Sequence, residues 1–132
     1  MMKPPPDTEL IDFPGSILWF DKEDGFMCAI SKKKPPSTIE DIKKSLKNFK
    51  EIMGDDRICI LIDVTNASEM SREGREYVAK EFPKLFKAIA MISGSVFGKM
   101  VANLFFTIKT QPYPTKMFTD EKEARKWLRQ YV

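Results

Sequence analysis

"RICILIDV", residues 57–64, is the stretch that decides the fold. Residues 58–62 are all apolar, with no alternation between apolar and polar side chains. This pattern is typical of a strand inside a sheet that is covered on both faces, whereas a half-exposed strand alternates. We therefore predict an α/β domain with this strand at its centre.

Strand and helix patterns lie on both sides of this stretch. "SILWFD" and "FMCAIS" flank the turn "KEDG" and predict a hairpin, and a helix follows from Ser37 or Thr38 to Gly54. The later elements are predicted as a helix from Ser71 to near Pro83, a strand over 87–93, a helix over 95–108, a strand over 113–118 and a helix capped by Asp120. This order predicts a single domain with a mixed sheet of about five strands and about four helices.

The first fifteen residues differ from the rest of the chain. Pro4, Pro5 and Pro6 stand next to each other, and no apolar face is evident. Residues 1–15 are therefore predicted to form an extended arm without a packing face, and residues 16–132 to form the domain.

The amino-acid composition of the chain disfavours several classes of function. The net charge of +3 comes from 22 basic and 19 acidic residues that are largely interspersed, so we expect no nucleic-acid binding. Histidine is absent, which disfavours the commonest general base and most zinc sites. We predict no enzymatic activity, no metal and no cofactor. Cys28 and Cys59 lie in apolar runs and no secretory segment precedes them, which predicts buried, reduced thiols in a cytoplasmic protein.

Two segments resemble functional sites but favour structural interpretations. Residues 88–108 are long and apolar enough to imitate a membrane span, yet Lys99 lies near the centre, so we predict a strand, a turn and a helix instead. Asp21, Glu23 and Asp24 cluster in the first hairpin. We interpret them as exposed turn residues with ordinary pKa values.

The predicted helix over 95–108 is apolar nearly all round, so it requires a second cover. That cover is, in order of preference, the loop that carries Tyr113, a second subunit in a homodimer, or a hydrophobic ligand. The side chains that such a surface would use are Phe97, Phe105, Phe106 and Tyr113.

The loop after the central strand is the best candidate site. Asp63 ends that strand, and ligands of open α/β sheets usually lie at the carboxyl ends of strands. Ser71 has the position of a helix N-cap, and Glu73 complements the positive end of the helix dipole. Gly74 falls on the apolar face of the helix, which suggests a close approach to the sheet.

These motifs together resemble a known family. "IDVTNASEMSREGREYVAKEF", "AIAMISGS", "ANLFF" and "PYPTKMFTDEKEARKWL" are similar to the STAS fold, and more closely to small SpoIIAA-like bacterial proteins of uncharacterised function. The resemblance extends over residues 16 to 131 and implies a STAS/SpoIIAA-like fold for the domain.

The resemblance also implies a site. In anti-sigma factor antagonists of the SpoIIAA type, a serine at the start of this helix is phosphorylated by a partner kinase. The matching position here is Glu73, so the usual phosphoacceptor is missing. Ser68 and Ser71 remain as alternative acceptors by proximity, and Glu73 either holds a state that resembles the phosphorylated one or only caps a helix.

We therefore predict a non-enzymatic, STAS-like regulatory domain that binds a protein partner. Its predicted surface is Asp63, Ser68, Met70, Ser71, Arg72, Glu73, Gly74 and Arg75. The alternative is a carrier or sensor of a lipid-like molecule, because SpoIIAA-like proteins are also grouped with SEC14-like lipid-binding folds.

Overall fold

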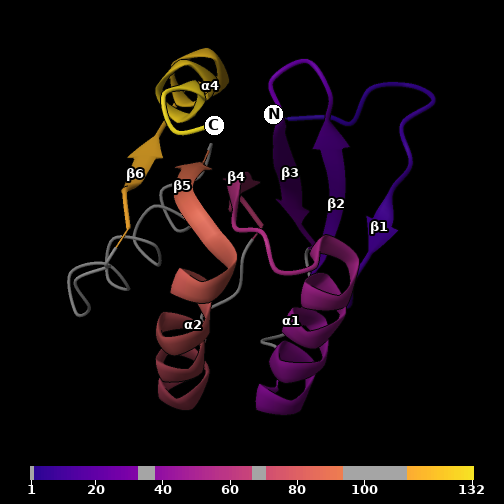
Figure 1. Cartoon of the computed structure of the whole chain (residues 1–132), viewed down its shortest axis with the longest axis vertical. Helices are drawn as coiled ribbons and strands as arrows, with labels where there is room; N and C mark the ends of the chain where they lie inside the picture. Colours follow the sequence, from indigo (N-terminus) through magenta and orange to yellow (C-terminus); the bar gives the residue numbers. More distant parts are fainter. Residues whose placement is uncertain (1, 33–37, 67–70, 94–112) are drawn as a thin grey trace.

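A computed structural model describes residues 2–32, 38–66, 71–93 and 113–132 of the chain. The described strands are β1 (Ile11–Asp12), β2 (Ser16–Asp21), β3 (Phe26–Ser31), β4 (Ile58–Asp63), β5 (Phe86–Ile92) and β6 (Thr115–Phe118). The described helices are α1 (Ile39–Met53), α2 (Arg72–Leu85) and α4 (Glu121–Arg129). Figure 1 shows their arrangement.

The strands form one six-stranded sheet whose spatial order follows the chain, from β1 to β6. The pairs β1–β2 and β2–β3 are antiparallel, and the remaining three pairs are parallel. The predicted α/β fold with a mixed sheet is confirmed. β1 was not predicted, because a two-residue strand has no alternation to detect. The helix predicted over 95–108 lies outside the described residues.

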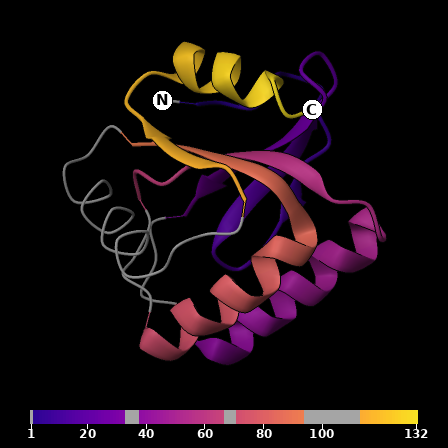
Figure 2. The same ribbon diagram turned by 60° about the vertical axis from the view of Figure 1, so that its left-hand side comes forward.

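The sheet is covered on both faces, with α4 on one face and α1 and α2 on the other (Figure 2). Side chains along β4 alternate between the two cores, as the pleat of a strand requires. Cys59 and Leu61 pack with Leu128 under α4, whereas Ile60 packs with Phe49 under α1. The predicted central position of β4 is confirmed, and both cysteine thiols are free and buried.

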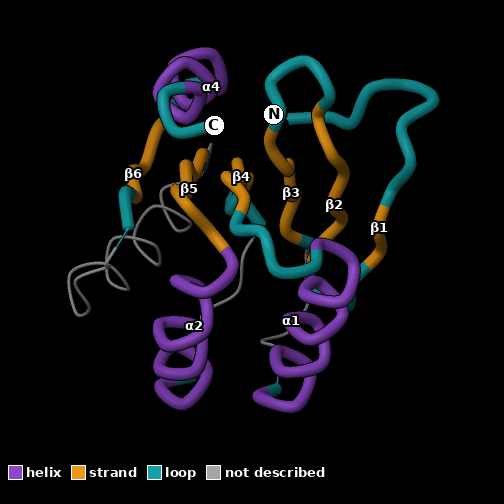
Figure 3. The backbone as a smooth tube through the Cα atoms, in the orientation of Figure 1, coloured by secondary structure: helices purple, strands orange, loops and turns teal. Residues whose placement is uncertain are grey.

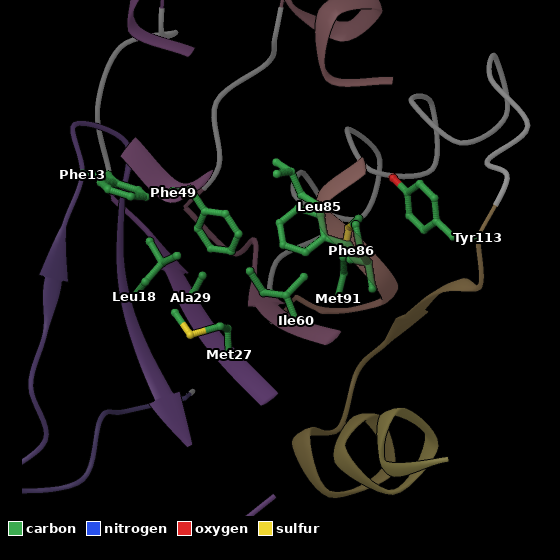
Figure 4. Packing of buried hydrophobic residues seen from close by; sticks show 11 residues of the cluster. Phe13, Leu18, Met27, Ala29, Phe49, Ile60, Leu85, Phe86, Met91 and Tyr113 are labelled. Carbon is green, nitrogen blue, oxygen red and sulfur yellow. The ribbon is translucent and has the colours of Figure 1, made fainter. Parts of the chain in front are cut away.

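The core under α1 and α2 is built from large apolar side chains (Figure 4). Phe49 of α1 and Phe86 of β5 have ring centroids 5.3 Å apart, and Phe82 meets Phe86 edge-on at 5.0 Å. Aromatic pairs in these geometries contribute beyond their buried area. They fix the two helices against the sheet.

Capping residues set the predicted helix boundaries. Thr38 accepts a hydrogen bond from the Asp41 amide at the start of α1, and Gly54 ends that helix with φ of 73°. The left-handed backbone at Gly54 suits glycine, which has no Cβ to oppose it. Asp120 holds the N-cap position of α4, but its side chain makes no capping hydrogen bond, so that part of the prediction is wrong.

The end of α2 lies near Pro83, as predicted, but two residues beyond it. The helix continues through Pro83 to Leu85 and enters β5 without an intervening loop (Figure 3). Pro83 removes one backbone hydrogen bond from the last turn. Leu85 and Phe86 are both buried, and the Phe86 amide bonds to the Phe82 carbonyl, which offsets that loss.

The N-terminal residues make contacts that the sequence did not indicate. Met2 is 3% exposed within the core under α4, and Phe13 is buried in the opposite core. The expectation that this part of the chain does not pack is therefore wrong at Met2 and Phe13, whereas the division into an arm over 1–15 and a domain over 16–132 stays a prediction. Among the described residues, no helix has the length and apolar character needed to cross a membrane.

Candidate functional site

Asp63 ends β4 and is one of the most deeply buried polar residues of the described chain, with 2% exposure. Its Oδ1 accepts a hydrogen bond from the Thr65 amide at 3.0 Å, and its Oδ2 accepts one from the Met2 amide at 3.4 Å. Burial of a carboxylate requires such donors, because an unpaired buried charge is costly. By the alternation along β4, Asp63 belongs to the same face of the sheet as Cys59 and Leu61, which is the face under α4.

The start of α2 lies on the other layer of the molecule. Ser71 is the N-cap, as predicted, and its Oγ accepts a hydrogen bond from the Gly74 amide at 3.1 Å. Gly74 is buried, whereas Ser71, Arg72 and Glu73 are exposed. The helix start is thus fixed from inside and presents charged side chains outside.

Charge at this surface is mixed. Arg72 Nε lies 3.2 Å from Glu76 Oε1, with the two side chains 87% and 50% exposed. An exposed pair one helical turn apart adds little stability, about 0.3 to 0.5 kcal/mol. Glu73 adds a negative charge in the first turn of α2. The surface therefore has ionic groups whose pairing could change at little cost in stability. Ser68 and Met70, predicted for this site, lie outside the described residues.

The predicted hydrophobic surface is described only at Tyr113. Its ring is 7% exposed in the core under α1 and α2 (Figure 4), and its hydroxyl has no hydrogen-bond partner in the part of the chain that the structure describes. Burial raises the pKa of Tyr113 well above its ordinary value of 10.0. Phe97, Phe105 and Phe106 lie outside the described residues.

A second cluster of charges joins the first hairpin to α4. Arg125 Nη1 lies 2.8 Å from both Asp21 Oδ2 and Asp24 Oδ2, and its Nε lies 2.8 Å from Glu121 Oε2. Arg129 Nε approaches Asp24 Oδ1 at 2.7 Å. Together these five residues form the hairpin clamp.

The carboxylates of the hairpin clamp are not the exposed turn residues that we predicted. The side chains of Asp21 and Asp24 are 14% and 13% exposed, and Arg125 is 16% exposed. The hydrogen bond from Arg129 lowers the pKa of Asp24 below its ordinary value of 3.8, against the opposing effect of burial. The predicted ordinary titration of Asp24 is therefore wrong.

One thiol lies beside the hairpin clamp. Arg125 Nη2 is 3.7 Å from Cys28 Sγ. Burial raises the pKa of Cys28 to about 12, although the charge on Arg125 acts in the opposite direction. A thiol with this pKa is almost entirely protonated at neutral pH, so it is a poor nucleophile and metal ligand. Within the described ranges, no group of three or more acidic, cysteine or histidine side chains could hold a metal ion.

Sequence reasoning missed the hairpin clamp, although one signal was present. Glu121, Arg125 and Arg129 repeat at intervals of four in the last helix, which predicts a charged stripe along one side of α4. What the repeat does not reveal is the partner of that stripe. Asp21 and Asp24 lie 104 and 101 residues away from Arg125 in the sequence.

Comparison with known proteins gives a family and a fold. Residues 18–132 match a family described as a domain of unknown function, DUF7793. The chain is similar in structure to an uncharacterised protein of the DUF3478 family with a SpoIIAA-like fold, from Shewanella loihica PV-4. The two are 19% identical, with a TM-score of 0.58 over 92% of this chain and 91% of that chain. The predicted SpoIIAA-like fold is confirmed.

A second solved structure is less similar. It is a protein of unknown function from Arthrobacter sp. FB24, 25% identical over 84% of this chain and 96% of that chain, but its TM-score of 0.31 is too low to support an argument. No curated protein matches the chain.

Proposed function

Because the chain belongs to the DUF7793 family of domains of unknown function and has a SpoIIAA-like fold, we propose that it is a non-enzymatic regulatory domain. It binds a protein partner through the start of α2, at Ser71 to Arg75, and acts in the cytoplasm. The observation that carries this proposal is a helix start that is fixed by the Ser71 cap and the buried Gly74 while Arg72 and Glu73 face solvent. A rigid, exposed and charged helix end suits recognition of a complementary protein surface.

Glu73 has a defined role in this proposal. Ser71 already bonds the Gly74 amide, so the cap does not depend on Glu73. What Glu73 adds is a permanent negative charge beside the positive end of the α2 dipole, worth about 0.3 to 1 kcal/mol in stability. We propose that partners recognise this charge as they would recognise a phosphorylated side chain at the same position.

Charge reversal tests the surface. The protein is purified from its native host with an affinity tag, as wild type and as the double variant Arg72→Glu/Arg75→Glu, and the captured proteins are compared by quantitative mass spectrometry. Lys44→Glu/Lys47→Glu is the matched control, because it makes the same change in charge at exposed positions on α1. The proposal requires partners that the first variant loses and the control retains. Identical partners in all three samples would refute it.

Glu73→Gln and Glu73→Ser test the role of the charge. Both variants keep the Ser71 cap, so we expect both to fold with stability within about 1 kcal/mol of wild type. If partners recognise the charge, both variants lose the partners that depend on Arg72 and Arg75. Retention of those partners by Glu73→Gln would show that the charge is dispensable.

The second candidate function is binding of a lipid-like ligand. It is favoured by the buried Tyr113 hydroxyl, which has no partner among the described residues and could bond to a polar group of an otherwise apolar molecule. Native mass spectrometry of the protein from its host distinguishes the two functions. Apolar cargo that is lost in Tyr113→Phe supports the ligand function, and an empty protein opposes it.

A further inference from the structure

The N-terminal segment lies over the buried end of β4. It begins on the side of the sheet that α4 covers (Figures 1 and 2). Met2 is 3% exposed and packs in the core under α4, together with Trp19, Ile92 and Leu128. Its amide donates to Asp63 Oδ2 across 61 residues of sequence. Met2 thus contributes an apolar side chain to the core under α4 and a hydrogen-bond donor to Asp63.

The chain beyond Met2 has few anchors before the sheet. Lys3, Pro5 and Pro6 are exposed, as are Asp7, Glu9 and Leu10, and regular structure begins only at β1. Asp7 has a φ of 64°, an unusual conformation for a residue other than glycine. A segment held at its two ends, by Met2 and by β1, opens more easily than a strand or helix of the core.

The three consecutive prolines fit a strap rather than a loose tail. Proline fixes φ and keeps a chain extended, so less conformational entropy is lost when the segment closes. The same stiffness makes the segment move as one piece when its anchor is released. Residues 2–10 therefore have a firm anchor, a stiff connection and an exposed outer surface.

Asp63 links this segment to the loop that leads to α2. Its other oxygen, Oδ1, accepts from the Thr65 amide, which is the second residue of that loop. We propose that residues 2–10 form an autoinhibitory strap. While Met2 is docked, Asp63 is shielded and the Thr65 amide stays bonded to it; when Met2 leaves, Asp63 at the end of β4 becomes accessible to solvent and to a partner. The partner step rests on the proposed function, whereas the strap itself does not.

Two variants of the full-length chain test the anchor separately. Met2→Ala removes the apolar side chain, and Met2→Pro removes the N–H that Asp63 accepts. Lys3→Ala is the control at the neighbouring exposed position. The measurement is amide hydrogen exchange, with the Thr65 amide as the reporter. The Val64 amide, which bonds to the Ile92 carbonyl, is the internal reference.

In both Met2 variants the Thr65 amide exchanges about tenfold faster than in wild type, whereas the exchange rate of the Val64 amide stays the same. In the Lys3→Ala protein the exchange rates of both amides equal those of wild type. Unchanged exchange at Thr65 in both variants overturns the strap. Equal acceleration at Val64 and Thr65 also overturns it, because the effect is then a general loss of stability.

The partner step is then tested with partners whose capture depends on Arg72 and Arg75. Greater capture by Met2→Ala than by wild type supports autoinhibition, and equal or lower capture overturns it. Failure of the proposed function is recognised separately, because it appears in the charge-reversal variants, in which the strap is intact.

Discussion

Removal of Arg125 tests whether the hairpin clamp holds α4 to the sheet. Arg125→Met is the informative substitution, because methionine keeps an unbranched apolar stem where the guanidinium now lies, 5.5 Å from the centre of the Phe26 ring. The variant therefore removes the charge and the hydrogen bonds with little loss of packing. Asp21 and Asp24 then remain together without the cation that lies 2.8 Å from each of them.

The magnitude follows from the burial of these groups. Breaking a fully buried ion pair by deleting one partner costs about 3 to 5 kcal/mol, because a charge is left uncompensated. The side chains of Asp21 and Asp24 retain 14% and 13% exposure, and Asp24 keeps its bond to Arg129, so water and the second arginine relieve part of this cost. We expect Arg125→Met to lower the free energy of unfolding by about 2 to 3 kcal/mol, a large fraction of the usual total.

Urea denaturation of the variant and wild type measures this difference. Lys84→Met is the matched control, since it breaks the exposed Lys84–Glu81 pair, with side chains 58% and 25% exposed, and should change stability by less than about 0.5 kcal/mol. Arg125→Met/Asp24→Asn should be less destabilised than the sum of the two single changes, because they share one interaction. A loss below about 1 kcal/mol in Arg125→Met would refute the reasoning, since the clamp would then be solvated like a surface pair.

The remaining predictions concern individual side chains. The pKa of Asp24 is lowered in the folded protein, so its carboxylate stabilises the fold above its ordinary value of 3.8 and this contribution is lost on further acidification. Urea midpoints should therefore fall more steeply below about pH 4 in wild type than in Asp24→Asn. Ser71→Ala should cost about 1 kcal/mol in urea denaturation, and Ser71→Asp only a few tenths. Cys28, with its raised pKa of about 12, should remain unmodified by a thiol reagent at neutral pH until the protein unfolds, as peptide mass spectrometry would show. Leu128→Ala should cost about 2 to 5 kcal/mol because that side chain is fully buried, whereas Ile52→Ala, at 53% exposure, should cost less than about 0.5 kcal/mol.

Features of the fold that depend on neighbouring residues could be predicted from the sequence. The unbroken apolar run of β4 identified a strand covered on both faces, and Thr38, Gly54 and Ser71 marked helix ends through contacts within a few residues. The end of α2 was predicted near Pro83 and lies two residues later, at Leu85, because burial of Leu85, a tertiary effect, outweighs the local rule against proline.

The same distinction between near and distant contacts applies to the candidate site. The bond from the Gly74 amide to Ser71 spans three residues, so the sequence pattern could predict it. The contact between Met2 and Asp63 spans 61 residues, and those between Arg125 and the hairpin span more than a hundred. The spacing of apolar and charged residues along the sequence does not indicate contacts between residues so far apart. For that reason Asp21 and Asp24 were predicted to be exposed although the folded chain covers most of their side chains, whereas Glu23 is exposed as predicted.

The residues at the two ends of the connection between β4 and α2 lie on opposite faces of the sheet. Asp63 belongs to the face under α4, where it meets Met2, whereas Ser71 begins a helix on the opposite face. Met2 and the Thr65 amide both bond to Asp63, away from the Ser71 cap, whereas a change at Glu73 alters surface charge without touching Asp63. Because the two perturbations share no contact, their effects on stability should add. Any departure from additivity in partner binding would then measure the coupling between Asp63 and the start of α2.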